Sequence, residues 1–166
     1  MFARIAKAGS PAFLAFVLLL SACAATQADG TAPTASADGV VKVKSAYAMD
    51  ETIARLKRDI AGKGIMFFAE IDQARLAADA GIALRPSTLL VFGNPPLGTQ
   101  FMTSNPVSGL DWPVRLLVIE DEQGRVWAAY TDFAYIARRH RIGDREAQFK
   151  MASEVIASIA SSVAVR

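Results

Sequence analysis

Thr88-Leu89-Leu90-Val91-Phe92 is the most apolar strand-like stretch of the chain, and Gly93-Asn94-Pro95-Pro96 follows it directly. The first stretch is rich in β-branched and aromatic side chains, which favours a strand buried in a sheet. Glycine and proline then end the strand. Asn94 is a good helix cap and Pro95 a good first helical residue, so a short helix is expected to follow through Phe101. The sequence therefore predicts a central strand that leads into a helix.

Two strand and helix pairs are expected on the N-terminal side of this strand. Residues 41–47 alternate apolar and polar side chains, as a half-buried strand does. Asp50 can cap a helix that closes at Gly62. Residues 65–71 form a bulky, nearly uncharged run of strand length, and Asp72 can cap a second, shorter helix.

The C-terminal part predicts a hairpin and two helices. Residues 114–120 and 126–130 are apolar runs separated by Asp121-Glu122-Gln123-Gly124, which is typical of a β-hairpin. Asp132 can cap a helix over residues 133–139. A last helix is expected from a cap at Asp144, with one apolar face at helical spacing. That face consists of Phe149, Ala152, Ile156, Ile159 and Val163.

The order of these elements predicts the fold class. Strands alternate with helices at first and pair as a hairpin later, which suits a two-layer α+β sandwich. The sheet is expected to be mixed or antiparallel, with about five strands and helices packed on it. Residues 41–166, about 125 residues, are enough for one domain with a single core.

The N-terminus carries the pattern of a lipoprotein signal. Arg4 and Lys7 precede an apolar run that is too short to span a bilayer, and Leu20-Ser21-Ala22-Cys23 follows it. Residues 1–22 are therefore expected to be a signal peptide. Cys23 would carry acyl chains such as palmitate, which hold a protein stably at a membrane when two or more are present.

The segment after the cysteine is expected to be a flexible tether. Residues 23–40 are mostly small and offer few bulky apolar groups to offset the entropy of ordering. Ala24 and Ala25 follow the cysteine, without an aspartate. In the Gram-negative lipoproteins that this segment resembles, that favours the outer membrane, with the domain facing the periplasm.

Composition excludes several classes of function. The chain has 18 basic and 16 acidic residues, and two of the basic ones, Arg4 and Lys7, lie in the expected leader. The remainder has 16 of each, so its net charge is near zero and gives no support for nucleic-acid binding. Cys23 is the only cysteine and His140 the only histidine, so neither a disulfide within the chain nor a Cys/His metal cluster is available.

The order of the motifs resembles the domain of unknown function 302 family over about residues 45–140. The resemblance is carried by residues 67–72, 84–95, Gly98-Thr99 and the segment from Gly109 through Asp111-Trp112-Pro113 to Val118. It implies a small α/β fold that tends to form dimers, and no established activity. Family members often carry a histidine at the position of Gln73, and an amide can neither titrate near neutral pH nor replace that histidine as a metal ligand.

The motif residues also predict a polar site. If the strands that end at Ile71 and Phe92 are parallel, and the strand that starts at Val114 is antiparallel to them, then Asp72, Asn94 and Asp111 emerge at one edge of the sheet. Thr99 and Arg115 would lie at the same rim, and the amides at the helix start after Asn94 offer a place for an anion. The simpler interpretation is that Asp72 and Asn94 only cap helices.

Two functions remain open from the sequence. The first and preferred one is a non-catalytic module, expected to be a homodimer, that presents Asp72, Asn94, Thr99, Asp111 and Arg115 to a small ligand or another envelope protein. The alternative is an enzyme that uses Asp72 and Asp111 as an acid and base pair. His140 is expected at a solvated helix end, where basic residues suit the helix dipole. No cofactor and no metal are expected.

Overall fold

The computed structural model describes residues 34–165, so the expected leader, Cys23 and most of the expected tether lie outside the described residues. Five strands form one antiparallel sheet in the order β1-β5-β4-β3-β2. The strands are β1 (Val40–Lys44), β2 (Met66–Asp72), β3 (Ser87–Gly93), β4 (Val114–Glu120) and β5 (Val126–Thr131). The expected α+β class is confirmed, with an antiparallel rather than a mixed sheet.

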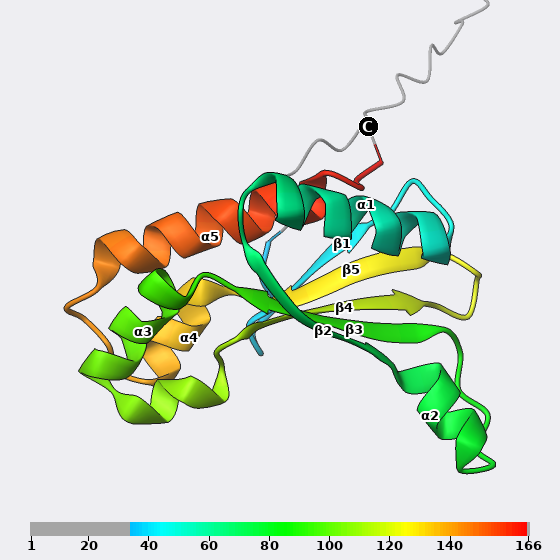
Figure 1. Ribbon diagram of the computed structural model, residues 1–166, viewed down its shortest axis with the longest axis horizontal. Coiled ribbons are helices and arrows are strands. Elements are labelled where there is room, and N and C mark those ends of the chain that lie inside the picture. Colours follow the sequence, from blue (N-terminus) through cyan, green and yellow to red (C-terminus); the bar gives the residue numbers. More distant parts are fainter. Residues whose placement is uncertain (1–33, 166) are drawn as a thin grey trace, which may run out of the picture. The chain divides into compact units, whose positions relative to one another are not determined.

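Two long helices, α1 (Met49–Gly62) and α5 (Glu146–Ser161), cover one face of the sheet (Figure 1). Alternation along the strands sends one set of side chains toward these helices. Val41, Leu90, Leu116 and Val118 lie in this set and are almost fully buried. The helices add the side chains Leu56, Ile60, Phe149, Ala152, Ile156 and Ile159. The predicted apolar face of the last helix is therefore confirmed.

Three short elements lie together at one end of the sheet (Figure 1). They are α3 (Pro95–Ser104), the 3-10 helix η1 (Pro106–Leu110) and α4 (Phe133–Arg139). The cap of α3 is Asn94, whose Oδ1 accepts the Leu97 N–H at 3.1 Å, and the cap of α4 is Asp132. Both caps were predicted, because a cap depends only on neighbouring residues.

The helix α2 (Gln73–Asp79) projects from the opposite end of the sheet (Figure 1). Asp72 caps it as predicted, with Oδ1 2.9 Å from the Arg75 N–H. No residue of α2 is buried. Because this segment extends past the end of the sheet instead of crossing its face, β2 and β3 pair as antiparallel neighbours. The predicted polar site assumed that these two strands run parallel, and this assumption was wrong.

Smaller differences concern strand order and helix starts. The middle strand is β4, and β3 lies one position from it. The helix α1 begins after Ala48 and α5 after Arg145, and neither cap residue makes a side-chain cap hydrogen bond. Asp50 lies in the first turn of α1, where its charge suits the positive end of the helix dipole.

The predicted hairpin joins β4 to β5. Asp121 organises its turn, because its carboxylate accepts the N–H groups of Gln123 and Arg125 and the indole N–H of Trp127. Burial works to raise the pKa of Asp121, but the hydrogen bonds from Trp127 and Arg125 outweigh it and hold that pKa well below its usual range. Asp121 thus serves the turn that the sequence predicted.

Candidate functional site

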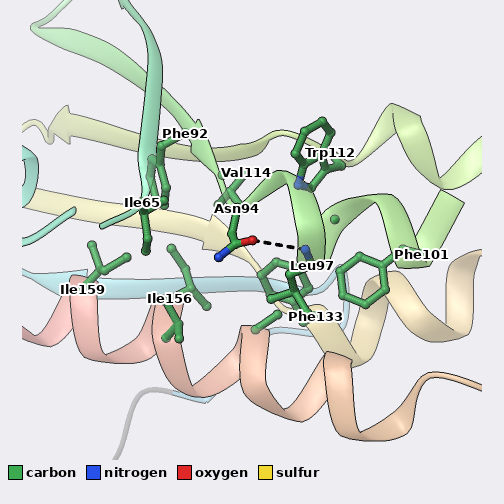
Figure 2. A pocket seen from close by; sticks show the side chains of 14 residues that line it. Ile65, Phe92, Asn94, Leu97, Phe101, Trp112, Val114, Phe133, Ile156 and Ile159 are labelled. Atoms are coloured by element: carbon green, nitrogen blue, oxygen red, sulfur yellow. Dashed lines mark hydrogen bonds between the residues drawn. The ribbon is translucent and has the colours of Figure 1, made fainter. Parts of the chain in front are cut away.

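An apolar cleft opens at the end of the sheet where β3 gives way to α3. The empty space at this place is about 400 Å³ when the solvent at its mouth is included, and about 40 Å³ of it is open to the centre of a water-sized molecule. Side chains from β3, α3, β4, α4 and α5 line it, and Figure 2 shows them converging from both sides. The apolar lining includes Ile65, Phe92, Leu97, Phe101, Val114, Phe133, Val155, Ile156 and Ile159.

Trp112 forms one wall of the cleft, and two glycines make room for it. A Cβ atom on Gly98 would overlap the indole ring, and one on Gly93 would lie 3.2 Å from its Nε1 atom. Neither glycine has a positive φ. These two positions of the Phe-Gly-Asn-Pro and Gly-Thr motifs therefore carry glycine because the indole packs directly against the backbone.

An aromatic cluster closes the cleft on the side of α4 and α5. Phe101 stacks on Phe149 with ring centroids 4.1 Å apart, and Phe133 lies 6.1 Å from Phe101. On the other side, Phe68 of β2 meets Trp112 edge to face at 6.0 Å. The rings of Phe101 and Phe133 are buried, whereas Phe68 is 43% exposed. The cleft thus has a buried aromatic interior and a partly exposed aromatic residue beside its wall.

Two N–H donors in the lining are unused. The indole nitrogen of Trp112 lies on the side of the ring that faces Asn94 and Leu97 (Figure 2). Within residues 34–165 neither this N–H nor the side-chain NH₂ of Asn94 has an acceptor, while Asn94 Oδ1 is taken by Leu97. An apolar lining with a few unused donors suits a small apolar ligand that carries a hydrogen-bond acceptor.

The start of α3 does not offer an anion site. Pro95 and Pro96 have no backbone N–H, and the N–H groups of Leu97 and Gly98 already donate to Asn94. Every backbone donor of the first turn is therefore absent or satisfied. The expectation that amides after Asn94 could hold an anion was wrong, because the prolines that favour the helix start also remove its donors.

Asp111 and His140 form a buried pair at the same end of the sheet. His140 Nε2 lies 2.6 Å from Asp111 Oδ2, and both side chains are 4% exposed. Because a carboxylate only accepts, the proton lies on Nε2. Arg115 and Arg139 also donate to this carboxylate, at 3.0 and 3.2 Å. Asp111 is thus fully engaged by three donors and is not available to a ligand.

This cluster fixes the segment that carries Trp112. Asp111 directly precedes Trp112, and the Trp112–Pro113 peptide bond is cis. The side chain of Asn105 donates to the His140 carbonyl at 2.9 Å, so both ends of the segment 105–111 are held to the end of α4. His140, expected at a solvated helix end, is instead buried and positions the wall of the cleft.

The pair lacks the other parts of a nucleophilic site. The hydroxyl of Ser108 is buried and has no hydrogen-bond partner in the described part of the chain. In residues 34–165 the His140 ring bonds Asp111 alone, so no hydroxyl is paired with the imidazole as a nucleophile would be. Nor do these residues contain a cluster of three or more His, Cys, Asp or Glu side chains that could hold a metal ion.

The structure separates the carboxylates that were considered as an acid and base pair. Asp72 pairs with Thr88 at one end of β3, whereas Val114, which follows Asp111, pairs with Phe92 near the other end. Phe92 lies four residue steps along β3 from Thr88, which is about 13 Å. The predicted convergence of Asp72 with Asn94 and Asp111 was wrong, because it assumed parallel strands.

The other residues singled out from the sequence fall outside the cleft. Thr99 donates to the Pro95 carbonyl of its own helix and faces solvent. Arg115 bonds Asp111 and the Leu110 carbonyl. Gln73, at the position where the family often has histidine, accepts a hydrogen bond from Ser87 at the far end of the sheet. Asn94 is thus the one predicted site residue that lines the cleft.

Most residues of the cleft could not be identified from the sequence, because their apolar pattern is the same as that of core residues. Ile65, Phe101 and Val155 come from segments far apart in the sequence, and each fits the periodicity of its own element. The available signal was the spacing of Gly93, Gly98 and Trp112. Two glycines near a tryptophan indicate close packing, but only the fold shows that they meet.

Comparison with known proteins supports the fold. The model of the family described as "Domain of unknown function DUF302" matches residues 41–163. The crystal structure of an uncharacterized conserved DUF302 protein from Bacillus stearothermophilus superposes with a TM-score of 0.69. It covers 75% of this chain and 98% of that one at 16% identity, so the likeness concerns the fold.

Part of the chain is also similar to proteins that are named as ion channels. "Fluoride-specific ion channel FluC 1" of Brucella suis is 39% identical over 105 residues, which are 63% of this chain and 41% of that protein. The protein of that name in Brucella abortus is also 39% identical, over 39% of its length. The chain thus spans about two fifths of the relatives that it matches. No helix between residues 34 and 165 is both long and apolar enough to cross a membrane.

Proposed function

The chain belongs to the DUF302 family, a domain family of unknown function, and we propose that it is a membrane-anchored module that binds a small apolar ligand. The observation that carries the proposal is the cleft under Trp112. Its lining is apolar except for Asn94 and the indole N–H, which is the usual composition of a site for a small ligand.

The chemistry of the lining defines the ligand class. The walls contribute alkyl and aromatic groups, so most of the ligand must be hydrocarbon. The indole N–H of Trp112 and the NH₂ group of Asn94 can both donate, so one end of the ligand should carry an acceptor such as a carbonyl or carboxylate oxygen. Fatty acids and similar acyl compounds meet both requirements.

The expected location fits this ligand class. Leu20-Ser21-Ala22-Cys23 supports a lipid anchor at Cys23, and the segment before residue 40 supports a tether to the outer membrane in the periplasm. A module held beside a bilayer meets acyl compounds at high local concentration. The family resemblance adds the expectation that the module works as a homodimer, and an envelope protein is the macromolecular partner that this location favours.

Co-purification tests the proposal. Val155 lines the cleft and is partly exposed, so Val155→Phe should fill the cleft, whereas Met151→Phe on the same helix changes an exposed residue outside it. Native mass spectrometry of the full chain from bacterial membranes should show a bound small molecule on the wild type and Met151→Phe. Val155→Phe should carry about tenfold less. Equal occupancy in Val155→Phe, or a bare wild type, would contradict the proposal.

A further inference from the structure

The segment that joins β2 to β3 exposes three large apolar side chains. Leu76 is 59% exposed, Ile82 62% and Leu84 52%. No residue of α2 is buried, and every residue from 78 to 86 is exposed. Figure 1 shows the reason, because α2 projects past the end of the sheet and away from the helices on its face. Single exposed apolar residues are normal, whereas three so close together on a projecting element mark an interaction site.

The part of this segment that follows α2 is an uncharged loop. It consists of Ala80-Gly81-Ile82-Ala83-Leu84, and we call it the α2 loop. Arg75 and Arg85 flank it in the sequence. Asp79 is the only acidic residue between positions 73 and 86, and it forms an ion pair with Arg75 at 3.2 Å. The segment therefore presents apolar groups and no unpaired carboxylate of its own.

The backbone of the α2 loop is suited to an apolar environment. The N–H groups of Ala80, Gly81 and Ile82 all donate to carbonyl groups in the last turn of α2. Gly81 has a φ of 74°, as the residue after a helix end often does. A backbone donor without a partner is costly to move into lipid, and the donors where this loop begins already have partners within the chain.

The area and the shape of the α2 loop favour a bilayer over a protein as its partner. With about 200 Å² for a large apolar side chain, Leu76, Ile82 and Leu84 expose about 350 Å² together. A standard protein interface takes about 800 Å² from each partner, which is more than twice that area. A projecting loop buries its sides against a protein only where that protein has a matching groove, whereas lipid surrounds an inserted loop of any shape.

The expected lipid anchor keeps this loop near a bilayer. Cys23 precedes Thr34, the first described residue, by 11 positions, so the chain between them spans about 40 Å at most. A second contact made by a domain on such a tether is an intramolecular event, so a loop with weak affinity for lipid is still able to engage it. The chain enters the sheet at β1, and the loop follows β2 at the opposite edge, about 19 Å away.

We propose that the α2 loop inserts into the interfacial region of a phospholipid bilayer and forms a second membrane contact. This proposal rests on the lipid anchor proposed above. Ile82 and Leu84 enter the boundary between headgroups and acyl chains, and Arg75 and Arg85 remain at the level of the lipid phosphates. Attachment at opposite edges of the sheet then holds the domain in one orientation on the membrane, which a tether alone does not do.

Spin labels on matched cysteines test this contact. Cys23 is the only cysteine and the expected site of acylation, so an introduced cysteine is the single free thiol of the lipidated chain. Ile82 is 62% exposed in the α2 loop, and Leu110 is 64% exposed at the end of η1, which lies at the other end of the sheet. Full chains with Ile82→Cys or Leu110→Cys are labelled with a nitroxide and placed in vesicles of phosphatidylethanolamine and phosphatidylglycerol.

The accessibility of the label to two reagents reports its environment. Oxygen concentrates in the bilayer and a nickel chelate stays in water, so power-saturation EPR gives the ratio of the two accessibilities. The ratio should be several-fold higher for a label at position 82 than at position 110, and Leu84→Cys should give a similarly high ratio. Adding Leu84→Asp to the Ile82→Cys chain should lower the ratio to that of position 110, because a charge is costly in lipid.

Two results would overturn the proposal. One is an equal ratio at positions 82 and 110, and the other is loss of access to both reagents at position 82, which indicates cover by protein. Vesicle flotation separates this failure from failure of the anchor. A chain that floats with position 82 in water overturns the loop contact alone, whereas a chain that does not float overturns the anchor as well. Circular dichroism should show all variants folded, because the substituted side chains are exposed.

Discussion

The environment of His140 in the fold differs from the one that its neighbours in the sequence predict. It stands among arginines at the end of a helix, a pattern that predicts a solvated terminus. In the fold it is buried against Asp111, 29 positions earlier in the chain. The helix end was predictable because it depends on neighbouring residues. The burial was not, since the partner is supplied by a loop whose path depends on the whole domain.

Removing His140 should loosen the wall of the cleft. His140→Ala deletes a hydrogen bond to a buried carboxylate, which should lower the free energy of unfolding by about 2 kcal/mol. The fluorescence maximum of Trp112 should also move to longer wavelength, because the adjoining Asp111 loses its hydrogen bond to His140. Denaturant unfolding and tryptophan fluorescence measure the two effects. Arg138→Ala, an exposed neighbour, is the control, and equal stability of the two variants would refute the role assigned to His140.

At the scale of elements, helix caps were predictable and strand directions were not. Asp72, Asn94 and Asp132 each cap the helix that follows, because a cap needs only its next three residues. Whether β2 and β3 run parallel depends on the path of the intervening segment. That segment has apolar residues at helical spacing, yet it projects from the sheet. The sequence pattern alone therefore did not determine whether β2 and β3 are parallel or antiparallel.

The hairpin between β4 and β5 should be sensitive to acid through Asp121. The folded state holds the pKa of this carboxylate below its ordinary value of 3.8. Its contribution to stability is therefore present above that value and is lost as the pH falls through the lower pKa of the folded state. The indole N–H signal of Trp127 in NMR spectra of the folded protein should therefore stay constant through pH 3.8 and shift only as the pH nears the lower pKa of the folded state. An Asp121→Asn variant with the same acid response would contradict this assignment.

For the whole molecule, the fold class followed from the order of elements, but the cleft did not. The two-layer arrangement was predictable because helix and strand periodicities mark which faces are apolar. The cleft is a gap between those apolar faces, and its lining residues differ from ordinary core residues only in their placement. Asn94 and Trp112 attracted attention in the sequence, whereas the alkyl side chains around them had no distinguishing signal.

The anchor is a property of the whole chain, and one substitution tests it. Cys23→Ser removes the thiol that would be acylated, so the variant should keep its leader and lack the lipid. Intact-mass analysis of the membrane and soluble fractions would show the precursor mass in place of the mature lipidated mass. The same mass and the same membrane partition in wild type and variant would rule out the anchor.

The most direct test of the account is a titration with dodecanoate, followed by the fluorescence of Trp112. The full chain has two tryptophans, so Trp127→Phe leaves Trp112 as the single reporter. In this background the emission should change on addition of dodecanoate and reach saturation. Val155→Phe should weaken binding by about tenfold and Met151→Phe should leave it unchanged. An emission that does not respond to dodecanoate, or that responds equally in Val155→Phe, would contradict a ligand site under Trp112.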